Sequence, residues 1–279
     1  MLNAQKSLVD KEFVFTQQNF DQVVKLINDL SGICLTERKV DMVYSRLARR
    51  IRLHGLNDFD SYLAFVSDNQ EEQVNFINSL TTNLTHFFRE NHHFEYLKNT
   101  YFPEMFKNNQ RKIRFWSAGC STGEEPYTLA MLWHKLQDKP KYADFKILAT
   151  DLDTNVLDSC RQGIYSDDKL KPVGSEYRGF FKHTSVCKPD EKQINPKLQE
   201  IIFFKQLNLM DEWPISGPLD LVICRNVLIY FDKPTQKRLV ERFTELIRPG
   251  GCLMLGHSEN LSADKAALKA IGKTIYRKE

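Results

Sequence analysis

The chain of 279 residues is 42% hydrophobic and 27% charged, values typical of a globular protein with one large domain or two smaller ones. Its net charge of only +3 argues against a nucleic-acid-binding surface over the whole chain. The first residues lack the apolar core of a signal peptide, and no apolar run approaches a membrane span, so no membrane insertion is expected. Six scattered cysteines without a Cys-x-x-Cys pair predict reduced thiols in the cytoplasm, and neither they nor the histidines show metal-ligand spacing.

Residues 13–80 are expected to be helical and to form a small bundle, an N-terminal domain over residues 1–80. Apolar side chains recur at helical spacing in four stretches, and Asp58 is a candidate cap for the third. The second stretch is strongly basic. Its cationic residues are Arg38, Lys39, Arg46, Arg49, Arg50 and Arg52, against Asp41. Such a face is either solvated or a docking surface for an acidic partner, and the pattern alone leaves both interpretations open.

Residues 81–89, TTNLTHFFR, combine helix-cap residues, an aromatic pair and Arg89. These polar residues either cap the next helix, expected over residues 91–106, or line a cleft in which a ligand binds. We assign residues 81–110 to a linker helix region.

Strand and helix patterns alternate from residue 112 onward, which predicts βαβ units and a doubly wound, mainly parallel sheet in a domain over residues 111–279. Strands are expected at residues 113–118, 145–150, 201–206, 219–224, 252–256 and 274–277, and helices at 124–137, 154–162 and 235–247. Asp232 or Thr235 is a candidate cap for the last helix. The polar interval near residues 176–200 predicts a small antiparallel β-subdomain.

The stretch RFWSAGCSTGEEPYTLA, residues 114–130, reads as a buried strand, a glycine turn and the start of a helix. The turn has only Gly119 and Gly123, without the glycine pattern of dinucleotide folds or the Lys-Ser/Thr of a phosphate loop. Glu124 and Glu125 would repel a phosphate at the helix start. A cationic or neutral ligand such as S-adenosylmethionine fits better, although any α/β fold can contain such a turn.

Polar residues follow the predicted strands at the edge where open α/β sheets bind ligands. Asp151 suits a ribose diol or simply caps the next helix, and Asn208 with Leu209 suits an adenine edge and face. Arg225, Asn226 and Tyr230 follow the fourth strand, where buried polar groups need partners. His257 and Glu259 in GHSEN are weaker candidates that can be plain turn residues.

These motifs together resemble one known family. TTNLTHFFRE, FWSAGCSTGEEPYTLAM, ATDLDTNVLDSCRQGIY, CRNVLIYFDKPTQKRLVERF and GGCLMLGHSEN, in this order over residues 81–260, closely resemble the chemotaxis receptor methyltransferases, the CheR-type protein-glutamate O-methyltransferases. The resemblance implies an all-α N-terminal domain followed by a class I S-adenosylmethionine-dependent methyltransferase fold with a β-subdomain. It implies methyl transfer to glutamates on the cytoplasmic helical bundle of methyl-accepting chemotaxis receptors, with S-adenosylhomocysteine as product. It also implies a cytoplasmic monomer that is recruited to receptor arrays and binds no nucleic acid.

The family's functional positions can be carried onto this chain. The cofactor positions fall on Asn83, Thr85, Arg89, Glu125, Asp151, Asn208, Leu209, Asn226 and Val227. Arg89 and Tyr230 fall where the family orients the reacting groups, and the basic helix with Arg46, Arg49 and Arg50 matches its receptor-docking helix. In some members the β-subdomain binds a tether peptide at the receptor C-terminus, but KHTSVCKPDEKQINPK carries no pattern that we can match to this.

Three alternatives remain from the residues themselves. A small-molecule O- or N-methyltransferase would explain the strand-end residues but would leave the basic helical domain without a purpose. A non-catalytic S-adenosylmethionine-binding protein is disfavoured by Arg89, Asn226 and Tyr230. A nucleic-acid methyltransferase is disfavoured by the modest charge and by the lack of an Asn-Pro-Pro-Tyr-type strand end.

Overall fold

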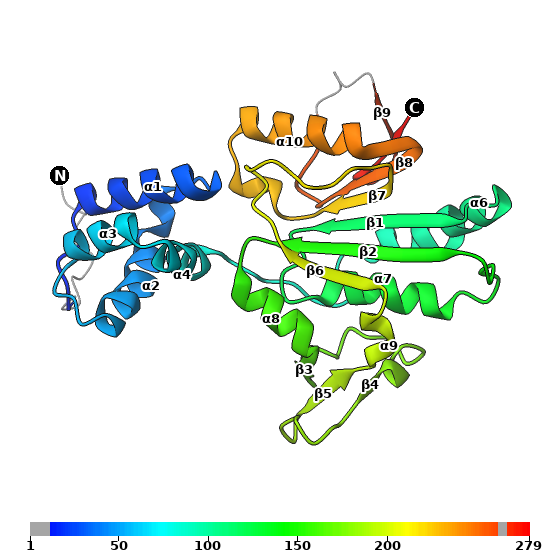
Figure 1. Cartoon of the computed structure of the whole chain (residues 1–279), viewed down its shortest axis with the longest axis horizontal. Coiled ribbons are helices and arrows are strands. Elements are labelled where there is room, and N and C mark those ends of the chain that lie inside the picture. Colours follow the sequence, from blue (N-terminus) through cyan, green and yellow to red (C-terminus); the bar gives the residue numbers. More distant parts are fainter. Residues whose placement is uncertain (1–11, 262–266) are drawn as a thin grey trace, which may run out of the picture. The chain divides into compact units, whose positions relative to one another are not determined.

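The computed structural model describes residues 12–261 and 267–279, which fall into two compact units that divide between Thr82 and Asn83 (Figure 1). No helix within these described ranges combines the length and the apolar character that a membrane span requires. The first unit is all-helical, and the second contains both sheets, as expected for the fold class.

From residue 12 onward, the N-terminal unit has four α-helices around an apolar core. They are α1 (Gln17–Ser31), α2 (Val40–Leu53), α3 (Phe59–Asp68) and α4 (Gln70–Leu80), with a short 3-10 turn η1 (Glu37–Lys39) before α2. Asp58 caps α3 by accepting a hydrogen bond from the Ser61 amide, as predicted. The helical periodicity therefore identified the bundle correctly, because each amphipathic stripe is buried against the others.

The basic face of α2 divides into internal and external cations. Arg50 forms an ion pair with Glu72 of α4, whose side chain is only 2% exposed. Arg46 donates from Nη1 to the carbonyl oxygens of Ser79 and Thr81 at 3.0 and 2.5 Å, where α4 ends. Arg49 is exposed on the same helix. Two of the three predicted docking arginines therefore hold the bundle itself together.

The C-terminal unit is built on a seven-stranded, mainly parallel sheet, which confirms the predicted fold class. Its order is β6-β2-β1-β7-β8-β10-β9, with β10 antiparallel to both of its neighbours. The strands are β1 (Lys112–Ala118), β2 (Asp144–Asp151), β6 (Ile202–Gln206), β7 (Leu219–Cys224), β8 (Ile247–Leu255), β9 (Leu268–Gly272) and β10 (Ile275–Lys278). Strand β9 was not predicted, because four of its five residues are exposed and it lacks an alternating pattern.

Helices cover both faces of this sheet. The main ones are α7 (Glu124–Lys135), α8 (Thr154–Gln162) and α10 (Lys233–Leu246). In Figure 1, α7 and α8 lie on one side of the sheet and α10 on the other. Successive residues of β1 point to opposite faces, so that Phe115 packs in the cluster with α7 and Trp116 in the cluster with α10. Asp232 caps α10 through the Thr235 amide, which decides between the two predicted caps.

The segment that we assigned to a linker contributes to the core of the C-terminal unit. It forms α5 (His92–Tyr96), the π-helical turn η2 (Leu97–Tyr101) and α6 (Phe102–Lys107). Phe94, Leu97, Tyr101 and Phe102 are each no more than 1% exposed. Their helical spacing gives one apolar face, and that face packs in the same cluster as Phe115.

The β-subdomain is a separate three-stranded antiparallel sheet. Its strands are β3 (Ile164–Ser166), β4 (Phe181–Lys182) and β5 (Glu191–Ile194), in the order β3-β5-β4. The two later strands lie near the predicted hairpin, but β3 precedes the predicted start of the subdomain. The short helix α9 (Pro196–Gln199) then leads back to the main sheet at β6.

Candidate functional site

The turn between β1 and α7 comes close to the end of β7, and glycine makes this approach possible. Gly119 and Gly123 have φ values of +84° and +96°. A Cβ atom on Gly119 would lie 2.3 Å from Cγ2 of Val227, and one on Gly123 would lie 2.9 Å from the hydroxyl of Tyr165. The turn therefore packs directly between the β7 loop and the start of the β-subdomain, with no space for a side chain.

Asp151, at the end of β2, faces the same turn. Its carboxylate accepts hydrogen bonds from the backbone amides of Ser121 at 2.8 Å and Asp153 at 3.0 Å. Burial raises the pKa of Asp151 to about 6, although both amide bonds act in the opposite direction. The cap of α8 is Asp153, which accepts from the Asn155 amide at 2.9 Å. The sequence had left open whether Asp151 itself caps the next helix, and the structure assigns that cap to its neighbour.

Asn83, the first residue of the C-terminal unit, also lies at this edge of the sheet. Its Nδ2 donates to Asp153 at 2.7 Å, and its carbonyl oxygen accepts from the Ser121 hydroxyl at 2.9 Å. Thr85 is half-buried two residues further on. Asn83, Asp151 and the glycine turn, which are far apart in sequence, are therefore linked by direct hydrogen bonds.

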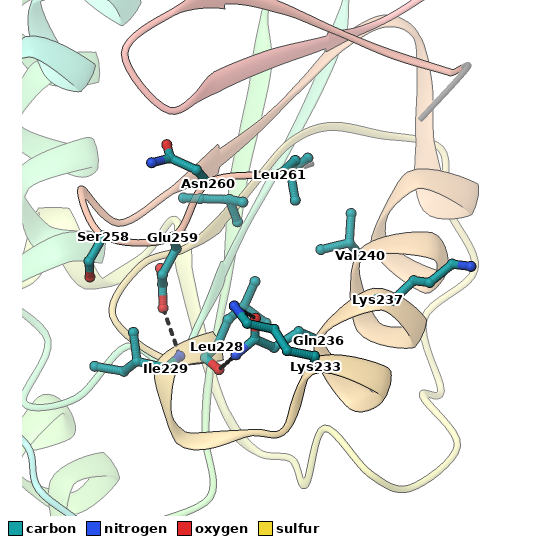
Figure 2. Close-up of a pocket in the computed structure, with 11 residues that line it drawn as sticks. Leu228, Ile229, Lys233, Gln236, Lys237, Val240, Ser258, Glu259, Asn260 and Leu261 are labelled. Carbon is teal, nitrogen blue, oxygen red and sulfur yellow. Dashed lines mark hydrogen bonds between the residues drawn. The ribbon is translucent and has the colours of Figure 1, made fainter. Parts of the chain in front are cut away.

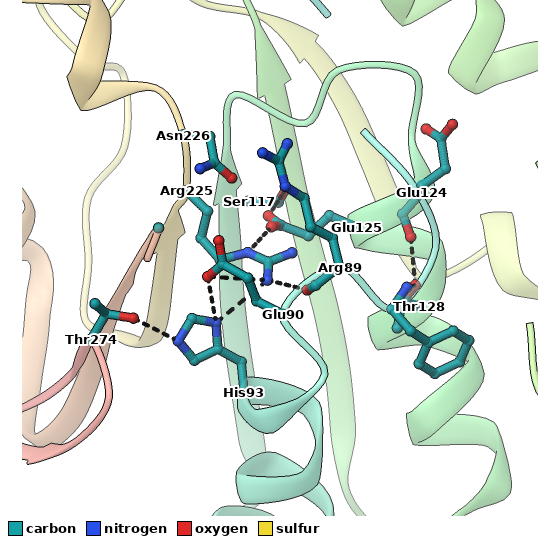
Figure 3. A network of polar contacts seen from close by, with 12 residues as sticks. Arg89, Glu90, His93, Ser117, Glu124, Glu125, Thr128, Arg225, Asn226 and Thr274 are labelled. Atoms are coloured by element: carbon teal, nitrogen blue, oxygen red, sulfur yellow. Dashed lines mark hydrogen bonds and ion pairs between the residues drawn. The ribbon is translucent and has the colours of Figure 1, made fainter. Parts of the chain in front are cut away.

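Glu125 and Arg225 form a buried ion pair beneath this edge (Figure 3). Nε of Arg225 donates to Oε2 of Glu125 at 2.7 Å, and the Ser117 hydroxyl donates to the other carboxylate oxygen at 2.6 Å. Nη1 of Arg225 also donates to the backbone carbonyl of Arg89. Arg225 thus fixes Glu125 and the chain at Arg89 at the same time, which the sequence did not reveal.

His93 lies against Arg225 on the other side of the network. Nη1 of Arg225 is 3.4 Å from Nδ1 of His93, and the hydroxyl of Thr274 is 3.1 Å from Nε2. Because a guanidinium only donates, Nδ1 must accept and Nε2 must carry the proton. Burial, together with the charge of Arg225, lowers the pKa of His93 to about 3, so the ring is neutral at physiological pH.

A cation site is disfavoured at this histidine, although three residues with possible metal-ligand atoms meet there. Glu90, His92 and His93 offer ligand atoms within 4.8 Å of one another. However, the Arg225 guanidinium lies 4.0 Å from Oε2 of Glu90 and already faces His93. A metal ion would have to displace or oppose this fixed positive charge.

Asn226 is the strongest sign of a bound polar ligand. It has a φ of +59°, and its Oδ1 is buried without a hydrogen-bond partner. A buried amide oxygen that is left unsatisfied costs free energy, so a ligand donor is expected to meet it. Its backbone amide donates to Glu259 at 2.8 Å.

Asn208 and Leu209 follow β6, as predicted. Leu209 is buried, and its carbonyl oxygen accepts from Arg242 of α10 at 2.8 Å. The Oδ1 atom of Asn208 accepts from the Met210 amide at 3.1 Å, which shapes the turn after the strand. The side chain of Leu209 packs in the same cluster as Trp116.

A cavity of about 640 Å³ lies beside this edge but is not the predicted cofactor site (Figure 2). It is lined from the β7 loop, from α10 and from residues 258–261, among them Ile229, Lys233 and Glu259. None of the predicted cofactor residues lines it. We therefore place the cofactor by the strand-end residues and not by this cavity.

Comparison with known proteins assigns the chain to a family. Residues 18–81 match the model of the CheR methyltransferase all-alpha domain, and residues 83–277 match that of the CheR methyltransferase SAM binding domain. The chain belongs to the CheR methyltransferase family. It is therefore an S-adenosylmethionine-dependent methyltransferase, and S-adenosylmethionine is its cofactor.

Named relatives cover almost the whole chain. Chemotaxis protein methyltransferase 2 of Pseudomonas aeruginosa is 41% identical, over 96% of this chain and 95% of its own length. The chemotaxis protein methyltransferase of Escherichia coli is 40% identical, over 95% of this chain and 92% of its own. The chemotaxis protein methyltransferase of Borreliella burgdorferi is 33% identical, over 99% of this chain and 100% of its own length.

The residues at the sheet edge fit this cofactor. The partnerless Asn226 oxygen can accept from an amino or amide group, and the Asp151 carboxylate can accept from a ribose diol. The glycine turn lets the loop after β7, which carries Asn226 and Val227, approach the turn closely. The assignment of individual contacts to Asn83, Thr85, Arg89, Glu125, Asp151, Asn208, Leu209, Asn226 and Val227 remains a prediction.

The raised pKa of Asp151 predicts pH-dependent cofactor binding. Only the ionised carboxylate accepts from both ribose hydroxyls, so below pH 6 binding must first release a proton. Affinity for S-adenosylmethionine should therefore be nearly constant above pH 7 and about tenfold weaker at pH 5. Isothermal titration calorimetry between pH 5 and 8 measures this. The Asp151→Asn variant should bind weakly with no such dependence, and an unchanged slope in that variant would assign the titration to another group.

Proposed function

We propose that this protein transfers a methyl group from S-adenosylmethionine to the side-chain carboxylate of glutamates on methyl-accepting chemotaxis receptors. The products are a glutamate methyl ester and S-adenosylhomocysteine. In this proposal the protein acts in the cytoplasm as a monomer that is recruited to receptor arrays, where methylation serves adaptation in bacterial chemotaxis. The names of its relatives support a role in chemotaxis.

The observation that carries the choice of acceptor is the state of His93. It is the imidazole that contacts Arg225, and its pKa is lowered to about 3. Its Nδ1 faces Arg225 and its Nε2 carries the proton, so it is a poor general base. A glutamate acceptor needs no base, since its pKa of about 4.3 leaves it ionised at neutral pH. An alcohol or ammonium acceptor would need one.

Bound S-adenosylmethionine supplies a sulfonium methyl group, and the protein's task is to place a carboxylate in line with it. Correct positioning alone can lower the barrier by roughly 7–11 kcal/mol. Positive and negative charge merge during the transfer, so a site that excludes water favours it. Arg225 and Glu125 are buried and neutralise each other, so neither charge attracts water beneath the sheet edge at which we place the cofactor.

Arg89 and Tyr230 are our candidates for orienting the acceptor. Arg89 uses Nη1 to donate to the carbonyl oxygen of Leu84 at 2.7 Å, which fixes its side chain along the junction segment. A bidentate arginine pair would hold a carboxylate but lower its nucleophilicity. The hydroxyl of Tyr230, as a single donor, would orient the acceptor with less effect on reactivity.

The acceptor can be tested with radiolabelled S-adenosylmethionine and a purified receptor cytoplasmic fragment. We expect label on the fragment that mild base releases as methanol, which is diagnostic of a methyl ester. A fragment with glutamine at its candidate glutamates is the matched control and should remain unlabelled. Base-stable label would instead indicate N-methylation, and it would refute the proposed acceptor.

Tyr230→Phe removes the proposed orienting hydroxyl while keeping the ring. We expect kcat on the receptor fragment to fall roughly 10–100-fold, because acceptor placement is lost, while the Kd for S-adenosylmethionine changes little. The matched control is Tyr142→Phe, which removes the hydroxyl of a half-exposed tyrosine that donates to Asn109 at 3.1 Å. Intact turnover with greatly weakened cofactor binding would contradict the orienting role.

Receptor docking is proposed for the N-terminal domain, residues 1–80, through the exposed cations of α2 and of the turn η1 before it. Arg38 of η1 and Arg49 of α2 are exposed, and so is Arg52 of α2, which forms an ion pair only with the exposed Glu12 among the described carboxylates, at 3.5 Å. Arg46 and Arg50 instead bond within the bundle. A cationic face of this kind is suited to an acidic helical bundle, with association that weakens as salt rises.

Reversing Arg38, Arg49 and Arg52 to Glu should strongly reduce receptor methylation and leave cofactor affinity unchanged. Reversing the exposed Lys171, Lys188 and Lys269 of the other unit gives the same change in net charge and should have little effect. Arg50→Glu should behave differently and destabilise the bundle by about 3 kcal/mol, because it places a second carboxylate beside buried Glu72. Equal methylation by both triple variants would exclude docking through these cations of η1 and α2.

A further inference from the structure

Glu259 is a buried carboxylate that the reaction as proposed so far does not use. It lies in the turn after β8 and is only 6% exposed. Its Oε2 accepts from the backbone amides of Gly256 at 2.7 Å and Asn226 at 2.8 Å, and its Oε1 accepts from the amide of Ile229 at 3.1 Å. One side chain thus satisfies three backbone donors from two separate loops.

Two of those amides belong to the loop that carries proposed site residues. Asn226 adopts a φ of +59°, a conformation that is uncommon for a residue other than glycine and must be held by its surroundings. Ile229, whose bond to Glu259 is drawn in Figure 2, lies in the 3-10 turn η4 (Leu228–Tyr230) and directly precedes Tyr230 in the chain. The two oxygens of the Glu259 carboxylate therefore hold two parts of the same loop. Oε2 holds the part with Asn226, which we assign to the cofactor, and Oε1 holds the part next to Tyr230, which we assign to the methyl acceptor.

The contact on the β8 side is equally restricted. A Cβ atom on Gly256 would lie 2.7 Å from the Asn226 amide nitrogen and 2.8 Å from its Nδ2. Glycine at this position lets the turn after β8 close on Asn226, and Glu259 then bridges the two chains. Residues 256–260 are therefore more than a surface turn, because both Gly256 and Glu259 contact Asn226.

We propose that Glu259 is a positioning residue, which fixes the loop after β7 so that Asn226 faces the cofactor and Tyr230 faces the acceptor. The part concerning Asn226 depends only on the cofactor. The part concerning Tyr230 rests on the proposed function.

The geometry distinguishes a carboxylate from an amide at this position. A glutamine can present one oxygen, which can still serve Asn226 and Gly256, but its NH2 group would then face the Ile229 amide, donor against donor. Glu259→Gln should therefore disturb mainly the Tyr230 end of the loop. Glu259→Ala removes all three acceptors, and because Glu259 lines the 640 Å³ cavity, water can reach the freed amides and the fold should survive.

Hydrogen exchange measured by mass spectrometry gives a readout that does not depend on catalysis. In the unliganded full-length protein, amides in residues 225–231 should exchange at least about tenfold faster in both variants than in wild type, because each variant loses at least one charge-assisted hydrogen bond. The matched control is Asp220→Asn. Asp220 is a carboxylate with 2% exposure at the opposite end of β7, and it accepts from the Arg114 amide at 2.6 Å. This control should lower the melting temperature without accelerating exchange in residues 225–231.

Binding and turnover then separate the two ends of the loop. Glu259→Ala should weaken S-adenosylmethionine binding by about tenfold in calorimetry. Glu259→Gln should keep the Kd within about threefold while lowering kcat on the receptor fragment by about tenfold. Unchanged exchange and unchanged cofactor affinity in both variants would overturn the proposal. If the wild-type protein does not methylate the fragment, the proposed acceptor fails, but exchange and calorimetry still decide the role of Glu259.

Discussion

The sheet edge at which we place the cofactor depends on the buried pair of Arg225 and Glu125. Either charge alone, at this depth, would carry a desolvation penalty of several kcal/mol. The pair forms because β1 and β7 are neighbouring parallel strands, with Ser117 opposite Ile223, so the residues that follow both strands meet at one edge. Arginine suits this position better than lysine, since its planar group can bond Glu125 and the Arg89 carbonyl in different directions at once.

This pair also determines what chemistry the neighbouring groups can perform. The fixed guanidinium, together with burial, keeps His93 neutral and its Nδ1 occupied, so the ring acts in packing and orientation. The same charge disfavours a cation at Glu90. Besides the hydrogen-bond acceptors Asp151 and Asn226, the proposed site has two donors, Arg89 and Tyr230, which can hold a carboxylate. Such a site can select and align reactants, and it suits an acceptor that is already ionised.

Sequence patterns predicted much of the fold and the strand-end residues, because both depend on local periodicity and on the rule that ligands bind at the carboxyl ends of parallel strands. They did not predict β9 or β3, which are short and lack a clear alternating pattern. They also undervalued Glu259, which in sequence is one polar residue in a turn. Its importance comes from three amides in loops that meet only in the folded chain.

The arginines of α2 illustrate the same limit. Arg46, Arg49 and Arg50 are indistinguishable as members of a basic run, and all three suggested a docking surface. What separates them is the partner helix, since Arg50 meets the buried Glu72 and Arg46 meets the last carbonyls of α4, while Arg49 meets solvent. One helix can thus carry arginines that stabilise its own bundle on one face and arginines that are open to solvent on the adjacent face. Only the cations that the bundle does not use internally can be available to a partner, and this restricts the proposed docking surface to the outer face of the helix.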